Sequence, residues 1–377
     1  MVKRRKTLEA GGVSKVLQSL LQPLGAVLIS LVLGAIIIAV SGEDVLNAYG
    51  IMLHGGFGNG NYLAATISRA TPIIMGGLAV CVAWKAGYEA MGGEGQMILG
   101  ALASALVALY VPGNGTVRII LAIAAAMLVG ALYSAISGWL YQRFGVNFII
   151  STLMMNYIAN NVASYLTTYV VKDPEALDLN SVQTAKLPES VRLGKLAGGL
   201  PIHWGFVLAV LAVAAVFIVI NYTAFGYKAR MGGINERFAR YGGINSKKML
   251  FSIMLLSGAL AGMGGAFEVL GSKYRYIDQM IFTAGFAWSG MVAALLANFN
   301  PFGTMFAAIM LAGLSNGGSA MQRSTEVPVE AVSVIEGIIM LLMSVKLLSV
   351  LRVRFKKRKA GDGNSPQNGG TCVEEMV

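Results

Sequence analysis

Amide and hydroxyl side chains interrupt one of the long apolar stretches of this sequence. Asn156 and Asn160 are four residues apart, so on a helix they share a face with Thr152. An asparagine side chain in lipid is costly unless it meets a partner. This face therefore either joins helices by hydrogen bonds, which is common in membrane bundles, or lines an aqueous pathway and contacts a substrate.

A second polar group lies in the run Gly92-Gly93-Glu94-Gly95-Gln96. The glycines loosen the backbone, and Glu94 and Gln96 then fall near a helix N-terminus, where the helix dipole favours a carboxylate. Irregular backbone at membrane depth is tolerated only where protein or a water-filled cavity covers it. The run predicts a broken or re-entrant helix that lines a pathway. The alternative is a cytoplasmic turn with a solvated Glu94.

The composition places these groups in a membrane protein. Of the 377 residues, 56% are hydrophobic and 12% are charged, whereas a soluble domain carries roughly 25% charged residues. Apolar runs of the length needed to cross a bilayer recur along most of the chain. The fold class predicted is an all-α polytopic membrane protein. The net charge of +11 lies mainly at span ends and in the tails, where it sets topology and does not indicate nucleic-acid binding.

The apolar runs predict about ten transmembrane helices with both termini in the cytoplasm, since the inner segments then hold more Lys and Arg than the outer ones. A basic arm, 1–23, precedes a transmembrane domain, 24–350, and a basic, disordered tail, 351–377, follows it. Residues 41–61 are expected to form an outer loop. The expected spans are 24–40, 62–83, 91–111, 117–141, 148–171, 202–221, 249–271, 283–297, 302–320 and 330–350.

The most basic internal segment is the loop 222–248, whose six cations oppose the single acid Glu236. Short basic loops are retained on the cytoplasmic side. Asn235 is a suitable N-cap, and Gly242 and Gly243 can supply the positive φ that ends a helix, so a helix of two turns is expected between them. Such a capped helix can dock into another protein. The alternative is a loop that only sets orientation.

Four segments, in this order, resemble the membrane permease subunits of bacterial ABC importers of the branched-chain amino acid, simple-sugar and nucleoside group. They are GGEGQMILGA (92–101), GVNFIISTLMMNYIA (145–159), GYKARMGGINERFARYGGI (226–244) and AWSGMVAALLANFNPFG (287–303). The second is similar to the nucleoside branch. The chain departs from the family pattern at Phe148, where an acid is usual, at Ser289, where Asp is frequent, and at Met91-Gly92-Gly93, where Asn-Ile-Gly is usual.

The resemblance implies a transport subunit of the bacterial plasma membrane that works by alternating access and has no catalytic residue, metal or bound cofactor. ATP would be used by a partner ABC ATPase, since this chain has no G-x-x-x-x-G-K-[ST] run. A second permease subunit in a heterodimer and an extracytoplasmic substrate-binding lipoprotein are the other implied partners. The residues implied in coupling to the ATPase are Asn235, Glu236, Arg237, Arg240, Tyr241, Gly242 and Gly243.

The resemblance favours a nucleoside as substrate. A nucleoside is neutral, with a flat base on which aromatic rings stack and polar edges that amides can pair with. A simple sugar such as ribose is the alternative substrate. A proton-coupled carrier that uses Glu268 and Glu336 is the alternative mechanism, and a passive channel is a third. The expected substrate-pathway residues are Glu94, Gln96, Asn156, Tyr157, Asn160, Trp288 and Ser289.

Overall fold

The structure is a computed structural model that describes residues 29–30, 32–36, 38–39, 42–173, 182–196, 199–325, 334 and 337–338. The expected first span lies partly outside these residues. Most of the tenth span, with Glu336, and both tails also lie outside them. Within the described part the regular elements are helices, accompanied by two isolated β-bridges in the loops.

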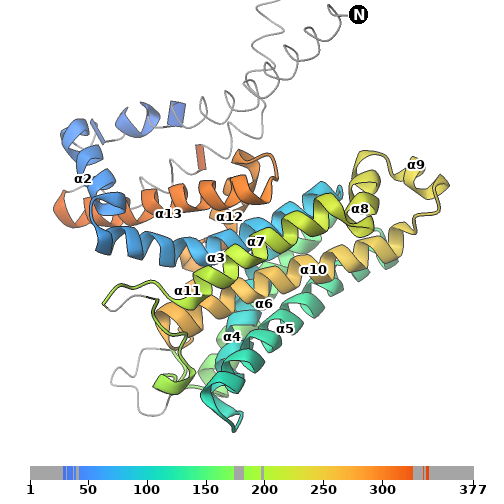
Figure 1. Ribbon diagram of the computed structural model, residues 1–377, viewed down its shortest axis with the longest axis horizontal. Helices are drawn as coiled ribbons and strands as arrows, with labels where there is room; N and C mark the ends of the chain where they lie inside the picture. Colours follow the sequence, from blue (N-terminus) through green and yellow to red (C-terminus); the bar gives the residue numbers. More distant parts are fainter. Residues whose placement is uncertain are drawn as a thin grey trace, which may run out of the picture.

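The helices form one bundle, with α2 at one end and α9 at the other (Figure 1). Asparagines begin several of them, because a side-chain oxygen before the first turn accepts a backbone N–H that the helix leaves unpaired. The elements are α2 Val45–Phe57, α3 Gly60–Lys85, α4 Gly93–Tyr110, α5 Gly115–Phe144, α6 Phe148–Tyr169, η1 Glu189–Val191, α7 Trp204–Tyr222, α8 Ala224–Ile234, α9 Glu236–Tyr241, α10 Ser246–Phe267, η2 Glu268–Lys273, α11 Met280–Ala284, α12 Phe286–Leu296 and α13 Pro301–Ser324.

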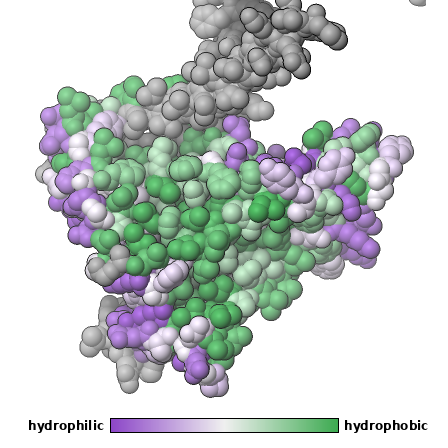
Figure 2. Space-filling model, viewed as in Figure 1, coloured by the Kyte–Doolittle hydropathy of each residue, from purple (hydrophilic) through white to green (hydrophobic). Residues whose placement is uncertain are grey.

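Five helical segments in the described residues are long and apolar enough to cross a membrane, namely α3, α4, α5, α7 and α10 continued through η2. Helices α6 and α13 reach the same length but are less apolar. Figure 2 shows an apolar band across one face of the bundle, with polar surface gathered toward the α2 end and at the α9 end. The chain is therefore an all-helical, polytopic membrane protein.

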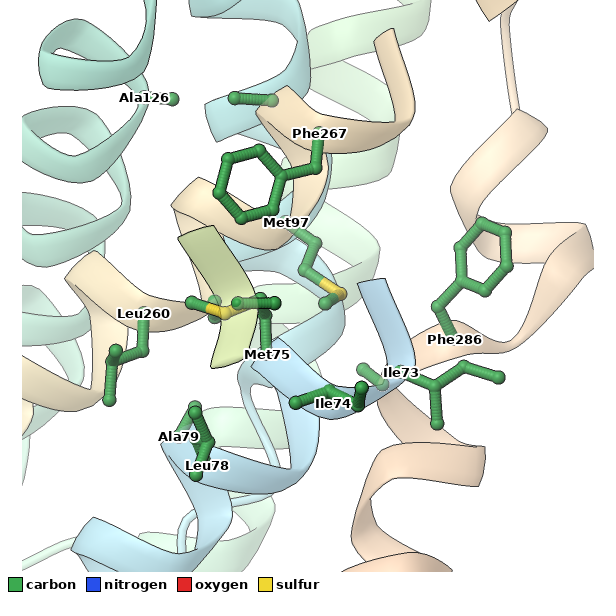
Figure 3. Close-up of a cluster of buried hydrophobic side chains, with 14 of the residues drawn as sticks. Ile73, Ile74, Met75, Leu78, Ala79, Met97, Ala126, Leu260, Phe267 and Phe286 are labelled. Atoms are coloured by element: carbon green, nitrogen blue, oxygen red, sulfur yellow. The ribbon is translucent and has the colours of Figure 1, made fainter. Parts of the chain in front are cut away.

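Helix α3 lies at the centre of the bundle, with 83% of its most apolar stretch buried, against 28% for α5 and for α7. Its side chains meet those of α4, α10 and α12 in one continuous core (Figure 3). The core residues labelled there are Ile73, Ile74, Met75, Leu78, Ala79, Met97, Ala126, Leu260, Phe267 and Phe286. Helix α3 runs through Pro72 without a break.

Glycines let the central helices approach backbone to backbone, as small residues do in membrane bundles. A Cβ on Gly262 of α10 would collide with the carbonyl oxygen of Ala126 in α5. A Cβ on Gly290 of α12 would lie 2.6 Å from the backbone nitrogen of Gly77 in α3. The pair Gly76–Gly77 thus lets α12 pack directly against the backbone of α3.

Three sequence-based expectations about helix limits were wrong. The segment 41–61 contains α2, whose Gly55 and Gly56 pack against the backbone of α13. The basic loop holds α8 as well as the expected short helix. The span expected at 283–297 is divided into α11 and α12 at Gly285, which has a left-handed φ of 61°.

The end of α10 also differs from the sequence-based expectation. Its last turn passes into the π-helix η2 at Glu268, and the helical segment ends at Lys273. A π-turn inside a membrane helix is uncommon and often marks a functional position. Glu268 is buried there, and Ser272 supplies it with a hydrogen bond.

Replacing Gly262 by valine is expected to destabilise the protein by about 1–3 kcal/mol or more, because α5 has no room for the side chain. The melting temperature in detergent and the yield of monodisperse protein measure this. Gly50→Val in α2 is the control, since a Cβ there meets nothing within 4 Å. Equal melting temperatures for the two variants would contradict the packing described here.

Candidate functional site

The chain between α3 and α4 folds back along α3 before α4 begins. Gly87 has a φ of +83°, and the residues from it to Gly92 are not helical. The indole nitrogen of Trp84 donates to the carbonyl oxygen of Ala90 at 3.2 Å, and Met91 lines the same small cavity as Val80. The first turns of α4 consequently lie beside the middle of α3, where a Cβ on Gly76 would be 3.2 Å from the Met97 methyl carbon.

Two side chains of α6 hold this non-helical segment, 86–92, in place. Asn156 accepts from the Gly95 nitrogen through Oδ1 and donates from Nδ2 to the Met91 oxygen, both at 2.9 Å. The Thr152 hydroxyl accepts from the Met91 nitrogen at 3.1 Å. Both Asn156 and Thr152 are buried. Of the two roles open to Asn156, the geometry favours the structural one, because both ends of its amide bind backbone.

The carboxylate of Glu94 meets the indole of Trp288. Trp288 Nε1 donates to Glu94 Oε2 at 3.0 Å. Glu94 is in the first turn of α4 and Trp288 is in the first turn of α12, which begins after the left-handed Gly285. Two helix N-termini thus face one place, and each contributes a partial positive charge that favours an acceptor there.

The cavity at this place is small. It has a volume of about 20 Å³, which is room for roughly one water molecule. Its lining comes from α3, the segment 86–92, α4 and α12. A molecule of the size of a nucleoside or a sugar does not fit in this cavity.

Three buried oxygens near the start of α4 lack a hydrogen-bond partner among the described residues. They are Glu94 Oε1, Gln96 Oε1 and Asn160 Oδ1. Asn160 lies one helical turn beyond Asn156, which binds the backbone of Gly95. Buried polar atoms in proteins nearly always have a partner, and of these three residues Glu94 is the one that lines the cavity.

The remaining two expected pathway residues lie elsewhere. Tyr157 is on the exterior of α6, 54% exposed, with its ring 6.0 Å from that of Phe282 in α11. Ser289 is buried within α12. The sequence-based search did not include Arg69 of α3, whose guanidinium lies 5.7 Å from the Phe286 ring. An arginine inside an apolar run is a sequence signal by which Arg69 could have been identified.

The expected coupling helix is α9, at the opposite end of the bundle from α2 (Figure 1). The Asn235 side chain caps it by accepting from the Phe238 nitrogen at 3.0 Å, and Arg240 Nη2 is 3.4 Å from Glu236 Oε1. Tyr241 is 93% exposed. Of the two glycines expected to end the helix, Gly243 has the positive φ, of 79°, and Gly242 does not.

Residues 62–344 match the family model described as branched-chain amino acid transport system / permease component. This chain belongs to that family. It is a multi-pass membrane transport component and not an enzyme. No solved structure matches it.

This permease is similar over most of its length to three curated relatives. The guanosine ABC transporter permease protein NupP of Bacillus subtilis is 34% identical over 92% of this chain and 99% of its own. The glucose ABC transporter permease protein TsgB13 of Haloferax volcanii is 30% identical over 92% of this chain and 93% of its own. NupQ of Bacillus subtilis, also named a guanosine ABC transporter permease protein, is 28% identical over 70% of this chain and 84% of its own.

Trp288→Phe removes the donor to Glu94 from the permease and keeps an aromatic ring. We expect uptake to fall roughly tenfold at an unchanged membrane level, since losing a hydrogen bond to a carboxylate costs about 1.5 kcal/mol or more. Initial uptake rates normalised to the amount of protein measure the effect. Trp139→Phe, on the exposed side of α5, is the control. Equal uptake by the two variants would show that the Trp288 hydrogen bond has no role in transport.

Proposed function

We propose that this chain is the permease subunit of an ATP-driven ABC importer of nucleosides. The similarity to NupP carries the proposal, because it extends over almost the full length of both chains. The site supports it through unpartnered acceptor oxygens, which suit the N–H and O–H groups of a nucleoside, and through the Trp288 ring, on which a base can stack. A simple sugar is the second candidate substrate, on the similarity to TsgB13.

In this proposal the α9 end of the bundle is cytoplasmic, as the basic residues around α9 favour. Both chain termini then lie in the cytoplasm, and α4 is a broken helix whose N-terminus lies at membrane depth. Helix α12 begins at the same depth. Opposed half-helix ends near the midplane are a common way for transporters to bind polar substrate groups without a fixed positive charge. Alternating access would open and close the Glu94–Trp288 contact.

This proposed orientation suggests where each partner protein would bind. The ABC ATPase would receive α9, through Glu236, Arg237, Arg240 and the exposed Tyr241. The extracytoplasmic binding lipoprotein would deliver substrate at the α2 end. ATP is then bound by the ATPase and not by this chain.

The outer face of α6 is proposed to pack against a second permease subunit. Tyr157, Asn161, Tyr165 and Tyr169 recur every fourth residue along it, and all four are exposed. The Asn161 Nδ2 donates to the carbonyl oxygen of Tyr157 in its own helix. An asparagine amide facing lipid is costly, so a protein surface is expected to cover this stripe. Bacillus subtilis has two related permeases named for guanosine, NupP and NupQ, which supports a heterodimer.

Uptake of radiolabelled nucleosides tests the function. The chain is expressed with its ATPase, binding protein and second permease, and the ATPase is either active or catalytically dead. We expect uptake that needs the active ATPase and that other nucleosides block, whereas ribose and leucine do not. Competition by ribose would favour the sugar alternative. Uptake that survives the dead ATPase and collapses with a protonophore would contradict the ABC mechanism and point to a proton-coupled carrier.

The second-permease surface can be tested by a bulky substitution. Asn161→Trp is expected to abolish copurification of the second permease, because the indole would separate the packed helices. Leu128→Trp is the matched control, since Leu128 is 61% exposed on α5, away from the stripe. Normal copurification by both variants would remove the α6 face from the interface.

A further inference from the structure

Helix α8 meets the turn after α3 backbone to backbone. A Cβ on Gly233, in the last turn of α8, would lie 2.6 Å from the Lys85 oxygen and 2.9 Å from the Gly87 nitrogen. A Cβ on Gly87 would in turn lie 2.8 Å from the Cα of Gly233. Side chains are essentially never found so close to backbone atoms, so only glycine fits on either side of this contact.

The start of α9 also acts on this turn electrostatically. Burial, and after it the charge of Glu236, the first residue of α9, raises the pKa of Tyr88 to about 12. Gly87 therefore meets the end of α8, and its neighbour Tyr88 lies within the electrostatic reach of α9.

The turn is also firmly attached to the candidate site. Seven positions separate Gly87 from Glu94, and the segment between them is bound at Ala90 by Trp84 and at Met91 by Thr152 and Asn156. A short chain held in this way has little slack to absorb a displacement at one end. A shift of Gly87 must consequently move the start of α4 or break these hydrogen bonds.

We propose that the Gly87–Gly233 contact transmits movement of the α8–α9 segment to the start of α4, and so controls the Glu94–Trp288 contact. The inference rests on the proposed function, in which the ATPase acts on α9. Gly87 and Gly233 are positioning residues here and do not touch the substrate. Close-packed backbones pass on a displacement because neither surface can yield. The covalent connections of α8 to α7 and of α9 to α10 are separate routes, which substitutions at this contact leave intact.

The chain offers a matched pair of substitutions. Gly233→Ala inserts a methyl group into the contact, whereas Gly232→Ala, one residue earlier in α8, inserts it where nothing lies within 4 Å. Both changes raise helix propensity by the same amount. The complete transporter, reconstituted with ATPase and binding protein, is assayed for ATP hydrolysed and for guanosine transported.

The ratio of ATP hydrolysed to guanosine transported is the deciding quantity. We expect Gly232→Ala to match the unmodified protein and Gly233→Ala to keep assembly and ATP hydrolysis while the ratio rises roughly fivefold or more, the usual scale of a coupling between sites. Arg240→Glu in α9 is run alongside and is expected to raise the ratio too. An unchanged ratio in Gly233→Ala with a raised ratio in Arg240→Glu would overturn this inference and leave the proposed function standing.

Two further outcomes are decided in the same assay. An unchanged ratio in Arg240→Glu would remove the coupling role of α9, on which the inference depends, and so would overturn it. Should Gly233→Ala fail to assemble, Tyr88→Phe decides, because it removes only the hydroxyl beside Gly87 on which the charge of Glu236 acts. We expect the ratio of ATP hydrolysed to guanosine transported to be higher in Tyr88→Phe than in Tyr227→Phe, which changes an exposed tyrosine of α8. Equal ratios in these two variants would overturn the inference.

Discussion

Backbone N–H and C=O groups that water cannot reach must find partners within the protein. The helices satisfy this constraint internally, but the segment 86–92 is not helical and does so only in part, through the nitrogens of residues 86, 87, 88 and 90. Asn156 and Thr152 of α6 bind both backbone groups of Met91, and the indole of Trp84 binds the carbonyl oxygen of Ala90. The irregular backbone can therefore lie against the middle of α3, and the position of Glu94 depends on it.

Glycine determines how closely the helices around this segment approach. The contact of α5 with α10, the contact of α3 with α12 and the contact of α8 with Gly87 all place backbone against backbone. Such contacts are rigid, because they contain no side chain that can change rotamer. The candidate site thus lies among helices whose spacing is set by backbone contacts, so a shift of one of them would change the size of its small cavity.

Much of this arrangement could be predicted from the sequence, and some of it could not. Long apolar runs predicted the helices, and Asn235 predicted the start of α9, because both signals are local. Helix α2 was missed because its glycines suggest a loop, and it is packing on α13 that stabilises it. The Glu94–Trp288 hydrogen bond joins residues 194 positions apart, so no local pattern indicates it. The π-turn at Glu268 likewise has no local signal that we used.

The hydrogen bonds of Asn156 go to main-chain atoms, and this has an evolutionary consequence. Hydrogen bonds to the Met91 oxygen and the Gly95 nitrogen are indifferent to the side chains at positions 91, 92 and 93. Those positions can diverge, as Met91-Gly92-Gly93 does from the usual Asn-Ile-Gly, without loss of the scaffold. Gly95 has no such freedom, since a Cβ there would lie 3.0 Å from the Cα of Asn156. Residues 91–93 can thus change, and with them the ligand preference at the start of α4, while the hydrogen bonds that hold α4 to α6 are kept.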